Sequence, residues 1–380
     1  LGADTMRWLD RLDAEVDNIG AALEWAFESD PVRAIQLCVA FVPYWRTRSL
    51  RAKALPAWLV SLAVDILRRA AALVPSLPLP GPGEERDRTV LISRLLSGLA
   101  WSEAVWGSAA RGVGPGDEAV RLAHKADDPR TLAEAMGARN LVAIFAGDPN
   151  LRDMHAEASR AAEMAEDWWL FAMIEAGWAV REAADGDIAA AEGRLEKVTA
   201  AANRIGNPFV QAFAMLTHGR VAGFAKRLPD VRRWFASTIA AYEDLEDQHL
   251  IVIARSDFAH ALRHAGVIDE AEELYVQTIH FWQHFGNRGA VANQLECFAF
   301  IAIERDDLPR AARLFGAAET IRAAADARMV EHERIEYEAA LSVLRERLDP
   351  STLESAWAEG RQLSLEEAVQ SAVGGAPAAA

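Results

Sequence analysis

Helix-capping residues recur every 40 residues along the middle of the chain. Asp or Asn stands at five such positions: Asp127, Asp167, Asn207, Asp247 and Asn287. Each precedes an amphipathic stretch, where a side-chain oxygen can accept one of the backbone N–H groups left unpaired at the start of a helix. A fixed period of this length is typical of an array of stacked helical units rather than of a single compact core.

A second turn lies about halfway through each unit. Glycine can adopt the left-handed conformation that ends a helix, and proline suits the first turn of the next helix. The sequence therefore predicts that each unit consists of a helix A, a tight turn, a helix B and a loop. The turns are Gly147-Asp148, Gly186-Asp187, Arg227-Leu228-Pro229, Gly266-Val267 and Asp306-Asp307.

Side chains of one kind also recur at fixed places within the units. A small residue late in helix A should let helices A and B approach closely, and three columns at spacings 0, 3 and 7 should share one face of helix B. Asp148 and His155 stand in the aliphatic and bulky columns of the first unit, which is therefore atypical. The small column of helix A is Ala179, Gly219, Ala259 and Ala299; the columns of helix B are aliphatic (Ile188, Leu228, Ile268, Leu308), small (Ala191, Val231, Ala271, Ala311) and bulky (Leu195, Phe235, Tyr275, Phe315).

This order of positions resembles the tetratricopeptide repeat over residues 128–326. The unit is longer than the standard 34 residues, and in this respect it resembles the long repeats of the MalT-like group. HEAT repeats have a similar length but not this order of small, turn, small and bulky positions. The resemblance implies an all-α fold, a right-handed α-solenoid of tetratricopeptide-like helix pairs with a ~40-residue period.

The segment from Trp8 to Trp25 and segments near the other end of the chain resemble the C-terminal helical region of bacterial STAND-type ATPase transcriptional regulators of the LuxR/MalT-like and AfsR-like groups. Near the C-terminal end, the resemblance rests on residues 310–319, in the last repeat, and on residues 356–368. In such regulators the region follows a nucleotide-binding domain, and it also occurs attached to adenylate-cyclase-like proteins. Because the chain starts with Leu1, we expect it to be part of a longer polypeptide. The first match rests on Trp8, Leu12, Glu15, Asp17, Asn18, Ala21, Ala22, Leu23 and Trp25.

The sequence predicts five segments. Residues 1–73 form a helical lead-in, 74–83 a Pro/Gly linker that cannot be helical, 84–326 the repeat array, 327–372 the capping helices and 373–380 a disordered tail. At the start of the array we expect a long helix near 88–110, a break at Gly112 to Gly116, and a short helix to Ala126.

Charge and cysteine content exclude several classes of partner. The formal net charge is −16, from 40 Lys and Arg against 56 Asp and Glu. Since cations are not clustered, we expect no direct contact with nucleic acid. Cys38 and Cys297 are far apart without a CxxC motif, which fits a reducing compartment. With no apolar run long enough to span a bilayer and no signal peptide, we expect a cytoplasmic chain that binds no membrane.

Catalytic and metal-binding motifs are absent from the sequence. It has no phosphate-binding G-x4-GK-[ST] loop, no G-x-S-x-G and no HExxH, so we expect no enzyme activity, no catalytic residue and no cofactor. His260/His264 and His280/His284 could each present two nitrogens to one metal. No third ligand is evident from spacing, so we expect no metal.

The chain has 12 tryptophans, which nucleic-acid binders use for stacking but most proteins use in their cores. Five stand at helical spacing on apolar faces, and we interpret them as core residues. Trp168 and Trp169 follow the cap Asp167, so one of the two should be exposed and could mark a contact site. The five are Trp101, Trp106, Trp178, Trp234 and Trp282.

Helix A of each unit should line the concave surface of the array. The positions one after and three before the small column, with residues near them, make the C-terminal half of this surface mixed in polarity, which suits a protein partner, a peptide or a small polar effector. His260 would add pH sensitivity near its ordinary titration range if it faces a carboxylate. The candidate binding residues are Arg220, Ser256, His260, Arg263, Asn293 and Glu296.

The resemblance implies a non-catalytic sensor that controls an attached nucleotide-binding or cyclase domain outside this chain. A structural scaffold that mediates self-association without a ligand is the alternative. An enzyme in its own right fits the sequence least well.

Overall fold

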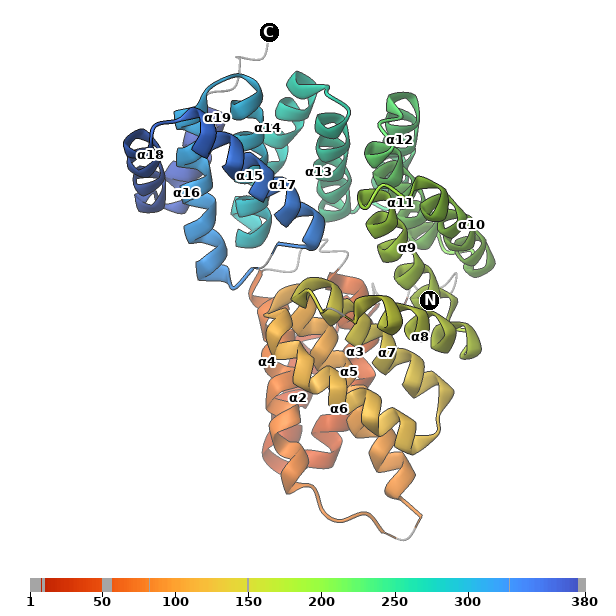
Figure 1. The fold of residues 1–380 in the computed structure, drawn as a ribbon. Helices are drawn as coiled ribbons and strands as arrows, with labels where there is room; N and C mark the ends of the chain where they lie inside the picture. The colour runs from red at the N-terminus through yellow and green to blue at the C-terminus, as the bar shows by residue number, and fades with distance from the viewer. Residues whose placement is uncertain are drawn as a thin grey trace. The chain divides into compact units, whose positions relative to one another are not determined.

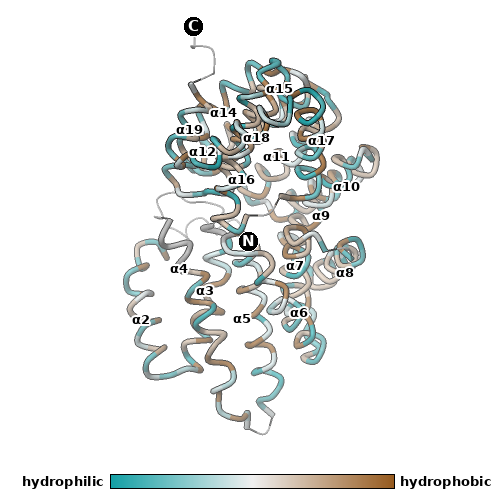
Figure 2. The backbone as a smooth tube through the Cα atoms, turned by 60° about the vertical axis from the view of Figure 1, so that its left-hand side comes forward, coloured by the Kyte–Doolittle hydropathy of each residue, from teal (hydrophilic) through white to brown (hydrophobic). Residues whose placement is uncertain are grey.

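In the computed structural model, the residues described are 8, 11–49, 57–81, 83–148, 150–327 and 329–374. They are almost entirely helical (Figure 1), and no strand occurs among them. Hydrophobic and hydrophilic positions are interspersed along the described helices (Figure 2). The predicted all-α fold of tetratricopeptide-like helix pairs is confirmed.

The helices before the regular repeats are α2 (Val16–Ser29), α3 (Pro31–Ser49), α4 (Ala57–Leu73), η1 (Val74–Ser76), α5 (Glu85–Trp106), α6 (Ala109–Ala126), α7 (Pro129–Ala146) and α8 (Leu151–Met164). The regular repeats comprise α9 (Trp168–Ala184), α10 (Ile188–Ile205), α11 (Pro208–Phe224), α12 (Leu228–Asp244), α13 (Gln248–His264), α14 (Ile268–Phe285), α15 (Arg288–Glu304) and α16 (Leu308–Ala325). The chain continues with α17 (Glu331–Arg347), α18 (Pro350–Gln362) and α19 (Leu365–Val373).

The 40-residue period is confirmed from α9 to α16. Helices A begin at Trp168, Pro208, Gln248 and Arg288, and helices B begin at Ile188, Leu228, Ile268 and Leu308. Both series advance by 40 residues. The small and bulky columns of helix B are buried from Ala191 to Phe315, as their spacing predicts.

Three of the predicted caps accept the expected backbone hydrogen bond. The Leu170 N–H donates to Asp167 (3.0 Å), that of Phe209 to Asn207 (2.9 Å) and that of Ala290 to Asn287 (3.0 Å). The prediction for Asp127 is wrong. This residue ends α6 in the left-handed conformation (φ 50°), and the next residue, Asp128, caps α7 instead.

The predicted break at Gly112 to Gly116 is also wrong. The chain turns earlier, at Gly107-Ser108, and α6 runs through both glycines and Pro115. A Cβ on Gly112 would lie 2.9 Å from Val142 and 3.1 Å from the Ala100 carbonyl oxygen. These glycines therefore permit close helix packing instead of ending a helix.

The Pro/Gly segment 74–83 is not wholly free of helix, because Val74–Ser76 forms one 3₁₀ turn. Leu77 also belongs to a hydrophobic cluster with Ile35, Leu67 and Leu95. The segment therefore separates two runs of helix but not two cores. The limits of the five predicted segments stay predictions. Most of the predicted disordered tail, residues 375–380, lies outside the described residues.

Contacts divide the chain into two compact units. Unit 1 comprises Leu1–Ala179, Ala189–Ala214 and Leu245–His249, and unit 2 comprises Val180–Ile188, Met215–Asp244 and Leu250–Ala380. In the described part of the chain, no helix is long and apolar enough to cross a bilayer.

The C-terminal helices of unit 2 begin with the predicted caps. Asp349 accepts from the Thr352 N–H with Pro350 in the first turn of α18, and Ser364 forms a capping box with Glu367 at α19. Helices α16 and α18 then pack backbone to backbone. A Cβ on Gly360 would lie 1.9 Å from the Arg313 carbonyl oxygen.

Gly360→Ala is therefore expected to destabilise unit 2 by about 1–3 kcal/mol, because the added methyl group has only rigid backbone to displace. Urea unfolding followed by circular dichroism measures the change. Gly193→Ala is the matched control: a Cβ there meets nothing within 4 Å, and a gain of about 1 kcal/mol is expected. Equal effects of the two substitutions would contradict the close helix crossing.

Candidate functional site

The predicted binding residues lie on the helices A of unit 2, and α17 lies across some of them. Arg220 is on α11, Ser256, His260 and Arg263 are on α13, and Asn293 and Glu296 are on α15. Helix α17 follows the last repeat and packs beside α15 and α16 (Figure 1). We call the four residues that hold its glutamates the α17 seat: Arg263 and His264 of α13, Asn293 of α15 and Arg322 of α16.

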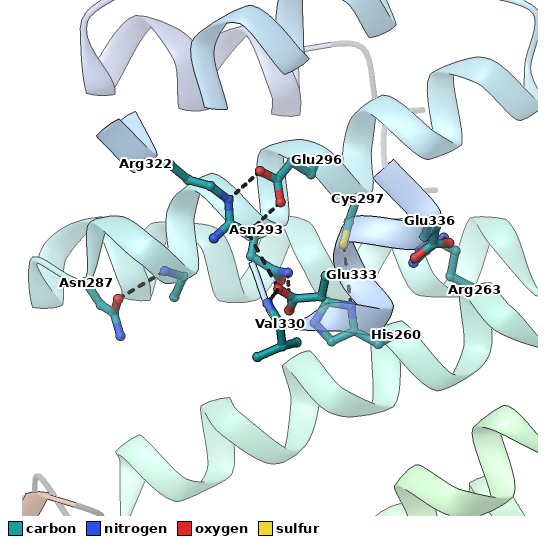
Figure 3. Close-up of polar contacts among 11 residues, drawn as sticks. His260, Arg263, Asn287, Asn293, Glu296, Cys297, Arg322, Val330, Glu333 and Glu336 are labelled. Atoms are coloured by element: carbon teal, nitrogen blue, oxygen red, sulfur yellow. Dashed lines mark hydrogen bonds and ion pairs between the residues drawn. The ribbon is translucent and has the colours of Figure 1, made fainter. Parts of the chain in front are cut away.

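The strongest contact in the seat joins Arg263 to Glu336 of α17 (Figure 3). The guanidinium donates two hydrogen bonds to the carboxylate, at 2.5 and 2.9 Å, and His264 Nε2 lies 3.5 Å from the same group. Burial alone would raise the pKa of Glu336, but the hydrogen bonds from His264 and Arg263 lower it well below its usual range. The pair is therefore charged at neutral pH, although the Arg263 side chain is only 8% exposed.

Glu333, one turn earlier on α17, is held less favourably. It accepts hydrogen bonds from Asn293 Nδ2 (3.0 Å) and from the Val330 N–H (3.2 Å), and Arg322 lies 3.8 Å away. Burial raises the pKa of Glu333 to about 7, and the attraction of Arg322 only partly opposes this. The carboxyl group therefore gains and loses its proton near neutral pH in the folded chain.

Because the pKa of Glu333 is raised by folding, its protonation favours the folded state, and this contribution is lost as the pH rises from about 4.5 through 7. Glu333→Gln should remove this pH dependence. Between pH 5 and pH 8 the wild type should therefore lose up to about 2 kcal/mol of stability that the variant keeps. Urea unfolding at several pH values measures the slope. Because glutamine also changes the hydrogen bonds, the test is how the stability difference between the two chains changes with pH, and not its value at any one pH. A parallel pH profile would contradict the raised pKa.

Glu296 belongs to a buried ion pair. Arg322 donates two hydrogen bonds of 2.6 Å to it, and Glu296 is 3% exposed. Burial raises the pKa of Glu296, and Arg322 opposes the shift. This pair joins α15 to α16, so Glu296 is committed to a buried contact between two helices.

Ser256 is also buried, in a polar network within the helix layer. Its hydroxyl accepts hydrogen bonds from Trp282 Nε1 and Gln294 Nε2, both at 3.0 Å, and Gln294 also donates to Thr278. The network ties α13 to α14 and α15. The Ser256 hydroxyl thus has its partners inside the helix layer, which explains why a polar residue at position 256 need not mark an exposed surface.

His260 faces a phenol and a thiol instead of a carboxylate. Its Nδ1 lies 2.8 Å from the Tyr275 hydroxyl and 3.4 Å from Cys297 Sγ. Burial, together with the positive charge of Arg263, lowers the pKa of His260 to about 3. The ring is therefore neutral at physiological pH, and the predicted sensitivity near its ordinary titration range is wrong.

Arg220 and Asn293 remain partly exposed. Arg220 donates hydrogen bonds of 2.9 and 2.6 Å to Asp257 of α13, and its side chain is 32% exposed. Of the six predicted residues, the structure thus brings Arg263 and Asn293 together against α17 and places the other four in separate contacts. The site residues that sequence reasoning missed are His264 as a seat residue, Arg322, Glu333 and Glu336.

The tryptophans and the atypical first unit have structural roles in unit 1. Trp169 is buried against Trp101, with ring centroids 5.9 Å apart, while Trp168 is partly covered by Arg204. The buried His155 occupies its bulky column and stacks on Trp178. Trp101, Trp178 and Trp282 are core residues as predicted, Trp234 is only partly buried, and the side chain of Trp106 lies outside the described residues.

No site for a metal ion is formed by three or more His, Cys, Asp or Glu within the described ranges. The pair His260 and His264 is divided between two environments, since one faces Tyr275 and the other faces Glu336.

Comparison with known proteins finds a limited sequence similarity and no matching family model. HTH-type transcriptional regulators from two strains of Mycobacterium tuberculosis and from Mycobacterium bovis are 26% identical to it over 214 residues. The match covers 56% of this chain but only 23% of each regulator, so it concerns less than a quarter of those proteins.

One solved structure, a Rap protein complexed with competence and sporulation factor, covers 86% of this chain and 100% of its own at 12% identity and a TM-score of 0.48. A similarity of that size does not bear on function. The chain is thus a tetratricopeptide-like helical region with weak sequence similarity to transcriptional regulators.

Proposed function

We propose that this chain is a non-catalytic interaction module of a larger bacterial transcriptional or signalling regulator. A protein partner, a peptide or a small polar effector binds the α17 seat, and binding controls an attached domain. The nucleotide-binding or cyclase nature of that domain comes from the sequence resemblance.

The observation that carries the proposal is the chemistry of the seat. Helices A that pack tightly on their other faces present Arg263 and Asn293 to a segment from outside the repeats, and these two residues contact it through polar side-chain hydrogen bonds. Side chains on rigid helices are well placed for specific recognition, because their positions do not depend on a loop. The sequence similarity to transcriptional regulators supports a regulatory role.

A peptide with the sequence of residues 329–348 tests the proposal, because it copies the segment that the seat holds. Its fluorescent form is titrated into a chain carrying Glu333→Gln and Glu336→Gln, in which the chain's own helix has lost the charge-assisted contact of Glu336 with Arg263. Saturable binding with one peptide per chain is expected. Adding Arg263→Met should weaken binding by about tenfold or more, since the peptide then loses its charge-assisted contact.

The scaffold alternative gives a different result. If the chain is only a self-association module, the peptide will not bind the weakened chain, and light scattering will show assembly that depends on chain concentration. Absence of saturable peptide binding would contradict the proposed binding function.

A further inference from the structure

We propose that α17 is a built-in competitor for the seat, and that the partner displacing it presents an acidic helical segment with two carboxylates one turn apart. This inference rests on the proposed function, since it assumes that the seat is a binding surface. It adds the chemical class of the partner and the means by which binding is regulated.

The chemistry of the partner follows from what the seat now holds. Glu333 and Glu336 are three residues apart on one face of α17, and they reach Asn293 and Arg263 respectively (Figure 3). The fork of a guanidinium matches a carboxylate in two parallel hydrogen bonds. A second glutamate pair with the same spacing would therefore satisfy the same donors.

Arg263 also has bonding capacity that α17 leaves unused. Its buried Nε–H has no hydrogen-bond partner among the residues that the structure describes. The guanidinium lies over the Phe300 ring at 4.7 Å, which fixes its plane. A partner that supplies one more acceptor here would bind Arg263 more completely than Glu336 does.

The first six residues of α17, 331–336, are held by few apolar contacts. The apolar anchors of the helix come after them: Tyr337 packs on Phe315 with ring centroids 5.0 Å apart, and Ala340 and Leu344 are buried. Ile335, between the two glutamates, is 54% exposed. Within residues 331–336, the His332 ring contacts the Phe224 ring, with centroids 5.6 Å apart.

Release of residues 331–336 would leave the packing of α16 against α18 in place. Helices α16 and α18, which flank α17 in sequence, meet backbone to backbone at Gly316 and Gly360 and do not depend on Glu333 or Glu336. The cost of moving residues 331–336 is therefore mainly the loss of polar contacts that an acidic partner replaces.

The experiment compares two chains and two peptides. The chains are the wild type and the Glu333→Gln/Glu336→Gln variant, and the peptides are residues 329–348 with glutamates or with glutamines at positions 333 and 336. The acidic peptide should bind the variant at least tenfold more tightly than the wild type, because only the wild type has an intact competitor. The glutamine peptide should bind both chains at least tenfold more weakly than the acidic peptide binds the variant.

Hydrogen exchange of the wild-type chain provides the second measurement. The acidic peptide should speed exchange of the amides of residues 334–338, about tenfold when it is present at ten times its dissociation constant for the variant. Equal affinities for both chains, or a glutamine peptide that binds as well as the acidic one, would overturn the inference while the proposed function stood. Failure of both peptides to bind the variant would instead remove the proposed function.

Discussion

Phe235→Ala is expected to lower the free energy of unfolding by about 3–5 kcal/mol, because it leaves a large cavity in the middle of the repeats. The ring is fully buried, stacks on Phe258 with centroids 5.2 Å apart, and occupies the space that Gly219 leaves open. A Cβ at position 219 would lie 2.9 Å from the ring. Urea unfolding followed by circular dichroism measures the loss.

The effect should also be local, since units of a repeat array are stabilised mainly by their neighbours. Hydrogen exchange should increase most in α11 to α13. Ile335→Ala serves as the control, because that side chain is 54% exposed and should contribute less than about 1 kcal/mol. An unchanged melting profile for Phe235→Ala would mean that the assigned repeat register is wrong.

Arg322→Met should be equally severe, at about 3–5 kcal/mol, for an electrostatic reason. It leaves the carboxylate of Glu296, which is 3% exposed, buried without its cation. The pKa of Glu296, already raised by burial, should rise further. The variant should therefore lose more stability at pH 8 than at pH 5.

The double variant Arg322→Met/Glu296→Gln separates this explanation from a loss of packing. Removing the stranded charge should restore most of the stability, because a neutral amide is far cheaper to bury than a carboxylate. If the double variant were as unstable as Arg322→Met alone, the guanidinium would act through its packing and not through its charge.

The repeat could be predicted from the sequence because each unit carries its own local signals. Caps such as Asp167 and Asn287 and buried columns such as that of Phe235 depend on contacts within a unit or with the next one. The prediction failed where glycine had two possible roles. Gly112 packs helices together, whereas the turn falls at Gly107, and only tertiary contacts distinguish the two.

The candidate site could be predicted only in part, because its other half comes from outside the repeat. Arg263 and Asn293 were predicted because they lie near the groove columns, but the columns cannot show that α17 folds back onto those residues. The column rule also treats Ser256 and Glu296 as surface residues, although each has a buried partner on another helix. The i, i+3 pair Glu333 and Glu336, directly after the array, is the sequence signal that could have indicated an acidic segment next to basic helices.

A charge exchange between Arg263 and the peptide tests most directly whether the seat is a binding surface. In the Glu333→Gln/Glu336→Gln background, Arg263→Glu should weaken binding of the acidic peptide of residues 329–348 by about tenfold or more. A peptide carrying Glu336→Arg should bind this Arg263→Glu chain to within about threefold of the original affinity, since the pair is restored with opposite polarity. An acidic peptide that binds equally well with and without Arg263→Glu would contradict the assignment of the seat.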